Sequence, residues 1–230
     1  MLILACDTSN STCCAGLYEG GKELEYEISL ETRTHSETFM PLVERVINKA
    51  GKKYSDIDAF AVTTGPGSFT GIRIGISVVK GMSLALEKPC IAVSATHALA
   101  GSVETESDLP EDTILVPCFD ARNKRVFASV IAHHNMEELV EEGAYSAADL
   151  GYLITEIPDI KNKKIYVIGN GAEVMREVLM ALDLKADYAP GAVILPRGVA
   201  SAALQSKKLI SGAELTASYC AVSSAERLRK

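Results

Sequence analysis

The sequence predicts an α/β protein built from two related subdomains, each a mixed β-sheet flanked by helices. In each half a strand meander is followed by apolar residues at helical spacing. An aspartate ends the first strand of each meander, Asp7 in one half and Asp120 in the other. The acidic stretch 104–112 contains Pro110 and is typical of a linker. We therefore expect one subdomain at residues 1–104 and a second at 105–212, with the polar tail 213–230 packing back on the first.

The first half begins with an antiparallel three-stranded meander, expected at residues 2–5, 13–18 and 24–30. Thr34 and Glu37 then fit a capping box, and apolar residues at helical spacing run as far as Ala50. Strands are expected next at 59–62 and 90–93, on either side of a long helix.

That helix, expected at residues 69–86, follows a turn in which Gly65 and Gly67 permit backbone angles that are closed to other residues. Ser68 is its predicted N-cap. Its only charges are Arg73 and Lys80, so it is apolar nearly all round and must be covered on more than one side. It is either a core helix of its own domain or a helix that packs on its own sheet and on a second protein.

The second half repeats the pattern. Strands are expected at residues 114–119, 126–132 and near Leu139. A strand at 164–168 enters a glycine turn and a helix that runs to about Leu182, and a final helix is expected at 200–210.

The composition excludes several classes of function. The net charge of −7 argues against unaided binding to nucleic acid, and the absence of tryptophan gives little support for base stacking. The six cysteines show no C-x-x-C spacing, which favours a reduced cytoplasmic protein. No apolar stretch looks long enough to cross a bilayer, and no membrane partner is expected.

Two such halves, with a carboxylate at each first hairpin, are typical of the ribonuclease-H-like, actin-like ATPase architecture. In that architecture two hairpins and a glycine turn surround a nucleotide, because glycine turns at helix starts present free N–H groups. The candidate positions in a degenerate nucleotide cleft are Asp7, Asp120, Gly169, Asn170 and Gly171. Each of them also has a plain interpretation as a turn former.

Several motifs together point to one family. They are Ile3-Leu4-Ala5-Cys6-Asp7-Thr8-Ser9, His35-Ser36-Glu37, Thr64-Gly65-Pro66-Gly67-Ser68-Phe69-Thr70-Gly71-Ile72-Arg73-Ile74-Gly75, Asp120-Ala121-Arg122 and Gly169-Asn170-Gly171-Ala172. The chain resembles the bacterial TsaB (YeaZ) family of tRNA threonylcarbamoyladenosine biosynthesis proteins over nearly its whole length. The resemblance is weakest at 144–159, and Cys220-Ala221 replaces the leucine-arginine that closes the family's pattern.

The resemblance implies a non-catalytic partner subunit of the complex that installs threonylcarbamoyl on N6 of adenosine 37 in ANN-decoding tRNAs. Its partners would be the transferase TsaD, which it activates, the ATPase TsaE and a second copy of itself, with tRNA contacted only indirectly. The histidines that bind metal in TsaD correspond to Ala95 and Leu99 here, with His97 offset by two from each. Since alanine and leucine cannot ligate metal, no metal is expected. No cofactor is expected to bind tightly, and ATP or ADP belongs to the assembled complex.

Partner and dimer contacts are expected along the two amphipathic helices of the first half. The residues concerned are His35, Glu37, Phe39, Leu42, Val46, Phe69, Gly71, Ile72, Gly75, Val78, Val79 and Met82. The alternative functions are an ATP-dependent small-molecule kinase and a metal-dependent glycopeptidase-like enzyme. No Ser-His-Asp or Cys-His arrangement is evident that would support catalysis by this chain.

Overall fold

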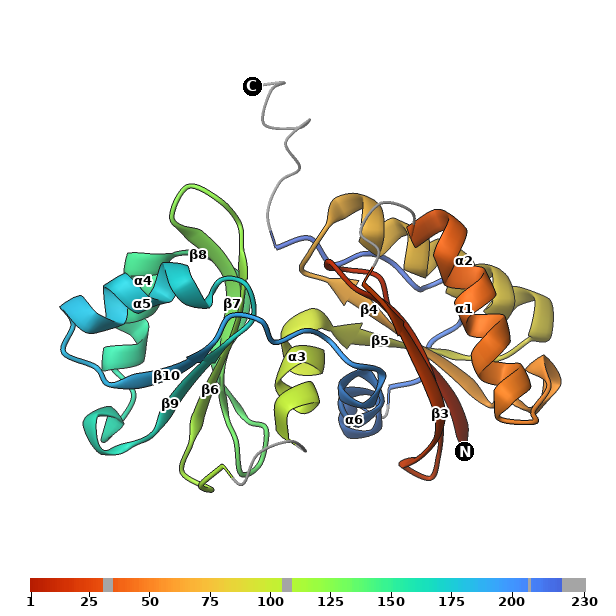
Figure 1. Cartoon of the computed structure of the whole chain (residues 1–230), viewed down its shortest axis with the longest axis horizontal. Coiled ribbons are helices and arrows are strands. Elements are labelled where there is room, and N and C mark those ends of the chain that lie inside the picture. The colour runs from red at the N-terminus through yellow and green to blue at the C-terminus, as the bar shows by residue number, and fades with distance from the viewer. Residues whose placement is uncertain (31–34, 105–108, 207, 221–230) are drawn as a thin grey trace. The chain divides into compact units, whose positions relative to one another are not determined.

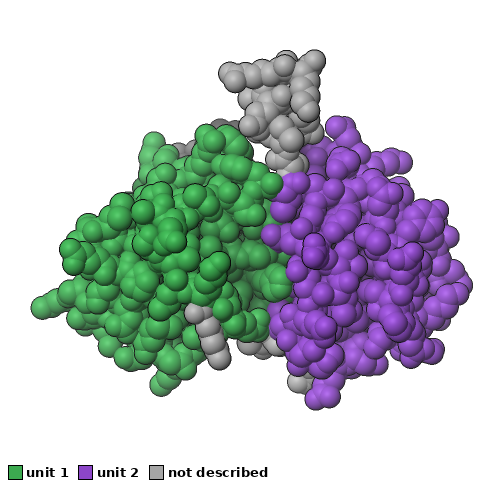
Figure 2. All heavy atoms as spheres, turned by 180° about the vertical axis from the view of Figure 1, so that it is seen from behind, with its two compact units in different colours: residues 1–102, 193–219 green, residues 103–192, 220–230 purple. Residues whose placement is uncertain are grey.

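The computed structural model describes residues 1–30, 35–104, 109–206 and 208–220. The chain forms two compact units (Figure 2). The first unit contains Met1–Ser102 and Val193–Tyr219, and the second contains Val103–Ala192 and Cys220. The first unit is therefore discontinuous in sequence.

The first unit is a five-stranded mixed sheet with helices on both faces (Figure 1). The strand order is β3-β2-β1-β4-β5, with the β1–β2 and β2–β3 pairs antiparallel and the β1–β4 and β4–β5 pairs parallel. Its elements are β1 (Leu2–Asp7), β2 (Cys13–Glu19), β3 (Lys22–Ser29), α1 (His35–Lys49), the 3-10 turn η1 (Tyr54–Asp56), β4 (Ala59–Gly65), α2 (Phe69–Leu86), β5 (Cys90–Ser94), α3 (Ala95–Glu104) and α6 (Pro196–Ser206).

The second unit repeats this topology, with the strand order β8-β7-β6-β9-β10. Its elements are β6 (Ile114–Asp120), β7 (Arg125–Ala132), β8 (Glu138–Ser146), α4 (Ala147–Thr155), the 3-10 turn η2 (Ile160–Asn162), β9 (Ile165–Ile168), α5 (Ala172–Ala181) and β10 (Ala186–Ala189). An antiparallel meander followed by two parallel strands in each unit confirms the prediction of two related α/β halves.

The core of the first unit lies between its sheet and the helices α1 and α2. Alternate residues of β1 point to opposite faces of the sheet, so Leu2, Leu4 and Cys6 pack toward α1 and α2. Ile3 and Ala5 face the other side, where α6 contacts β1, β2, β4 and β5. Both faces of the central strand are therefore buried within one unit.

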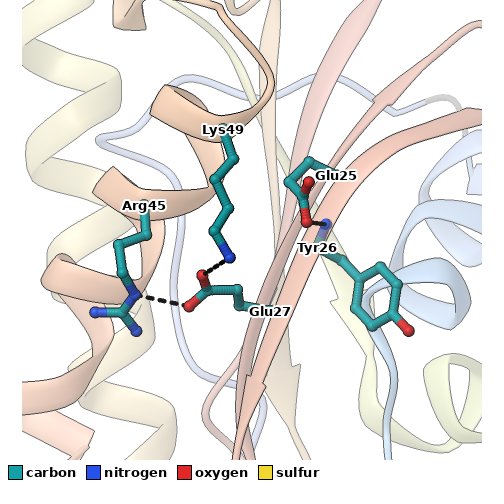
Figure 3. Close-up of polar contacts among 5 residues, drawn as sticks. All are labelled: Glu25, Tyr26, Glu27, Arg45 and Lys49. Carbon is teal, nitrogen blue, oxygen red and sulfur yellow. Dashed lines mark hydrogen bonds and ion pairs between the residues drawn. The ribbon is translucent and has the colours of Figure 1, made fainter.

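The exposed edge strand β3 is tied to α1 by an ion-pair network (Figure 3). The carboxylate of Glu27 lies 2.8 Å from Arg45 Nε and 2.7 Å from Lys49 Nζ. Partial burial raises the pKa of Glu27, but the hydrogen bonds from Lys49 and Arg45 outweigh it and lower the pKa below its usual value. The network joins α1 to the edge strand β3.

The structure corrects the predicted place of the last helix. It spans Pro196–Ser206 rather than 200–210 and belongs to the first unit, not to the second subdomain. Val199 and Ala203 are fully buried beside the first sheet, a long-range contact that periodicity does not reveal. Ile210 is not helical, because it forms an antiparallel bridge with Cys90 at the edge of that sheet.

The strand β10 was not predicted from the sequence. Helix α4 was not predicted, although Ser146 caps it by accepting a hydrogen bond from the Asp149 N–H, a pattern visible in the sequence. Thr34 of the capping box, residues 105–108 of the central linker and the tail after Cys220 lie outside the described residues.

Helix α2 corrects the expectation that no apolar stretch is long enough to cross a bilayer. It has 18 residues and is long and apolar enough, by length and composition, to cross a membrane. Seven of those residues are buried, and Ile72, Ile76, Val79 and Met82 among them belong to the core of the first unit. The apolar composition of α2 is therefore explained by its packing in the core of the first unit.

Candidate functional site

The turn between β1 and β2 is organised around the buried carboxyl group of Asp7. Its Oδ1 accepts hydrogen bonds from the Ser9 N–H at 3.0 Å, the Ser9 hydroxyl at 2.5 Å and the Thr63 hydroxyl. Among the described residues its Oδ2 has no partner, and it is buried. Burial raises the pKa of Asp7, while the bonds from Ser9 and Thr63 oppose the rise. Asp7 thus joins the turn to the end of β4.

The glycines of α2 pack against this same turn. A side chain at Gly71 would meet the Thr8 carbonyl, and one at Gly75 would meet the Thr8 hydroxyl. The Thr8 hydroxyl donates to the Gly71 carbonyl at 2.8 Å, and the Ser68 N–H donates to the Ser9 carbonyl at 2.7 Å. Ser68 caps α2 as predicted, because its Oγ accepts from the Gly71 N–H. These glycines therefore serve a close contact within the chain.

Most of the predicted contact residues are consequently not available to a partner. On α2 they are Gly71, Ile72, Gly75, Val79 and Met82, and on α1 they are Phe39, Leu42 and Val46. All eight are buried in the first unit, because the apolar stripe of each helix faces its own sheet. The expectation that they form an interface is wrong.

The remaining predicted residues lie on the outer side of the two helices. Glu37 and Phe69 are exposed, whereas His35 and Val78 are half-buried. His35 lies at the start of α1, with Nε2 3.0 Å from the Asn10 carbonyl oxygen. Sequence reasoning missed Met40, which is 39% exposed on α1. Met40 follows Glu37 by three residues, and this helical spacing places both residues on the same face of α1.

A groove of about 480 Å³ runs along this outer side. It is lined by Ser36, Phe69, Thr70, Arg73, Ile74, Ser77 and Val78. Its walls combine apolar side chains with hydroxyl groups and one guanidinium, and its lining among the described residues comes from α1 and α2. We refer to these seven residues, with Met40, as the outer α1–α2 face.

The candidate cleft residues of the second unit gather at the end of β6. Asp120 is exposed, accepts from the Arg122 N–H at 2.7 Å and donates its own N–H to Asn170 Oδ1 at 2.9 Å. A side chain at Gly171 would approach the backbone of Cys118 and Phe119. Asp120 thus makes the same i to i+2 turn bond as Asp7, but in water. Gly169 has φ 95°, a conformation that favours glycine.

A cavity of about 780 Å³ opens beside Asp120. It is lined by Asp120, Arg122, Asn123, Lys124, Ser146, Ala147, Ala148, Glu173, Val174, Glu177 and Val178. Asn170, Gly169 and Gly171 do not line it. Three carboxylates and two cations share its walls, so its lining carries no strong charge of either sign.

The described residues contain no group of three His, Cys, Asp or Glu side chains that could hold a metal ion. Ala95 and Leu99 are both fully buried on α3. His97 lies on the same helix, and its Nδ1 is 3.2 Å from the hydroxyl of Ser94.

Comparison with known proteins identifies the family. The family model of the tRNA N6-adenosine threonylcarbamoyltransferase TsaD matches residues 29–229. The chain belongs to the TsaD family. Its similarity to the TsaB proteins confirms the resemblance predicted from the motifs. It is 28% identical over 181 residues to the tRNA threonylcarbamoyladenosine biosynthesis protein TsaB of Bacillus subtilis, covering 78% of this chain and 75% of that protein.

A second relative is the protein of the same name from Escherichia coli. It is 34% identical over 127 residues, which is 55% of this chain and 53% of that protein. The match therefore spans only about half of the E. coli protein. Among solved structures, a Pseudomonas aeruginosa protein described as similar to peptidase YEAZ has a TM-score of 0.84 at 24% identity. It covers 96% of this chain and 99% of its own, and it supports the fold of two related α/β units.

Proposed function

We propose that this chain is a non-catalytic partner subunit in the biosynthesis of threonylcarbamoyladenosine in tRNA, and that it binds and activates the transferase TsaD. The observation that carries the proposal is the family membership, combined with the finding that the described residues hold no group of three side chains able to bind a metal ion. Relatives that share most of this chain's length bear the name of a biosynthesis protein of that pathway. Ala95 and Leu99 supply no metal ligand at the positions where the resemblance places them.

The outer α1–α2 face is the proposed surface for TsaD and, in the free protein, for a second copy of this chain. Met40 and Phe69 are more than a third exposed there, and Ile74 and Val78 are half-buried beside them. Apolar and aromatic groups around a groove are the composition that a protein interface uses at its centre. The eight buried residues of the two helices support this face from below rather than contact the partner.

Nucleotide is proposed to belong to the assembled complex, which includes the ATPase TsaE, rather than to this chain alone. The mixed charges around the cavity at Asp120 are a poor match for a triphosphate. Calorimetric titration of the chain with MgATP tests this point. We expect no binding at micromolar concentrations, and a tight nucleotide complex would contradict the proposal.

Reconstitution tests the function directly. Unmodified tRNA, threonylcarbamoyl-adenylate, TsaD, TsaE and ATP are combined with and without this chain, and modified adenosine is measured by mass spectrometry. We expect turnover only when the chain is present, and no turnover when TsaD is omitted. Equal activity without this chain would reject the proposal. Modification in the absence of TsaD would show that the chain is itself the enzyme.

A further inference from the structure

The first turn of α2 carries a cluster of two aromatic rings and a guanidinium, formed with the end of the segment that follows α6. The rings of Phe69 and Tyr219 stack with centroids 4.9 Å apart. The guanidinium of Arg73 lies 3.7 Å from the centroid of the Phe69 ring, and its Nε donates to the Tyr219 hydroxyl at 3.0 Å. Phe69 is 38% and Tyr219 is 43% exposed, so the cluster lies on the surface.

The segment that brings Tyr219 to this place is firmly attached. Leu215 is buried in the core of the first unit, and the Ser218 N–H donates to the Thr64 carbonyl at 2.8 Å. Lys80 donates from the middle of α2 to the carbonyls of Ala213 and Leu215. The Tyr219 ring is therefore held on the α2 face by a well-anchored backbone.

Arg73 has no acidic partner within the part of the chain that the structure describes, and only its Nε carries a hydrogen bond there. Arg176 on α5 provides the contrast, since it also stacks on a tyrosine, Tyr188, at 4.1 Å. Arg176, however, makes a bidentate pair with Glu173, at 2.9 and 3.0 Å. Within the described residues, the Arg176 guanidinium is thus neutralised by a carboxylate, whereas Arg73 is an exposed residue without one.

We propose that Arg73, held on the Phe69–Tyr219 platform, receives a carboxylate side chain of the partner protein at the end of the outer α1–α2 face. A planar guanidinium fixed by stacking is preorganised for a bidentate bond to a carboxylate, because little side-chain freedom remains to be lost. No acidic residue occurs between Phe69 and Leu86, so the only charged side chains on α2 are the cations Arg73 and Lys80, on a chain of net charge −7. Tyrosine and arginine are also the types that dominate binding energy at interfaces. Tyr219 acts as a positioning residue for Arg73.

This inference rests on the proposed binding to TsaD, and binding assays with purified TsaD test both. Dissociation constants are measured by calorimetry for wild type, Arg73→Lys, Arg73→Gln, Tyr219→Phe and Tyr219→Ala. Each variant is first shown to unfold like wild type in urea, as expected for exposed side chains. Arg176→Lys is the matched control, because it changes a stacked arginine whose charge is already paired.

We expect Arg73→Lys and Tyr219→Ala to weaken binding by about tenfold or more, and Arg176→Lys to leave it unchanged. Tyr219→Phe keeps the stacked ring and loses only the bond to Nε, so it should weaken binding by a smaller factor. Wild-type affinity should fall as the salt concentration rises, and the fall should be shallower for Arg73→Gln, which has lost the charge.

The outcomes separate the two proposals. If wild type does not bind TsaD, both the proposed function and this inference are rejected. If wild type binds and the Arg73 and Tyr219 variants bind equally well, only this inference is rejected. The alternative ligand for a stacked guanidinium is a tRNA phosphate. Loss of tRNA binding by the Arg73 variants, with TsaD binding intact, would replace the carboxylate by that phosphate.

Discussion

The carboxyl group of Asp7 is held by the turn that it organises, and we expect its role to be structural. Three donors from Ser9 and Thr63 converge on its Oδ1. Asp7→Asn keeps an acceptor oxygen for them, so we expect TsaD binding and reconstituted tRNA modification within a few-fold of wild type. Asp7→Ala leaves these buried donors without an acceptor and should cost about 1–3 kcal/mol in urea unfolding. A folded Asp7→Asn protein that binds TsaD but abolishes modification would show that Asp7 supports nucleotide or metal here.

The same residue predicts a dependence of stability on pH. Because burial raises the pKa of Asp7, the folded state holds its proton more tightly than the unfolded state. The protonated Asp7 carboxyl therefore stabilises the folded state. This stabilisation is complete below the ordinary pKa of 3.8 and is lost as the pH rises through the raised pKa of the folded protein. The asparagine side chain of Asp7→Asn cannot ionise. The free energy of unfolding of this variant should therefore rise relative to that of wild type as the pH increases from about 4. A constant difference over that range in urea titrations would contradict this.

Gly75 tests whether α2 needs its glycines for packing within the chain. A Cβ at this position would collide with the Thr8 hydroxyl and lie 3.4 Å from Val62. Gly75→Ala should therefore destabilise the protein by about 1–3 kcal/mol. Gly81→Ala on the same helix is the control, because nothing lies within 4 Å of its Cβ. That change should be neutral or stabilising by up to about 1 kcal/mol. Equal unfolding midpoints for the two variants would reject the packing argument.

At the scale of elements, the ion pairs of Glu27 attach the edge strand β3 to α1. The Glu27 carboxylate is 18% exposed, and its hydrogen bonds from Lys49 and Arg45 lower its pKa. We expect Glu27→Gln to cost at most about 1 kcal/mol near neutral pH. The loss should vanish as the pH falls through the lowered pKa, where wild type also becomes neutral. Glu25→Gln is the control, since Glu25 accepts from the Tyr26 N–H and makes no ion pair within 4 Å among the described residues (Figure 3). A loss that persists in acid would assign the effect to packing.

At the scale of the whole molecule, the discontinuous first unit makes a prediction about truncation. A chain that ends at Ala192 lacks α6 and the segment with Leu215, and it exposes one face of the first sheet. We expect its first unit to lose cooperative unfolding, whereas the second unit keeps its complete sheet and helices. The full-length protein is the reference for both units. Hydrogen exchange resolved by unit measures both, and protection of β1 and β4 in the shorter chain would contradict the prediction.

Local patterns in the sequence determined the two related halves, every strand except β10, the bounds of α2 and its cap at Ser68. These features depend on residues close together in the chain, through alternation, helical spacing and turn chemistry. The turn at Asp7 was also predictable, because an aspartate that bonds to the N–H two residues later is a local structure. The family followed from motifs of the same local kind.

Only the tertiary structure decided which unit contains α6 and which side of α1 and α2 is free. An apolar helix has the same sequence pattern whether its second side packs on its own sheet or on a partner. For this reason Phe39 and Gly75 were wrongly assigned to the interface. The contacts that settle the matter join residues far apart in sequence, as Gly75 joins Thr8 and Arg73 joins Tyr219. Burial is a property of the packed chain, and no local pattern contains it.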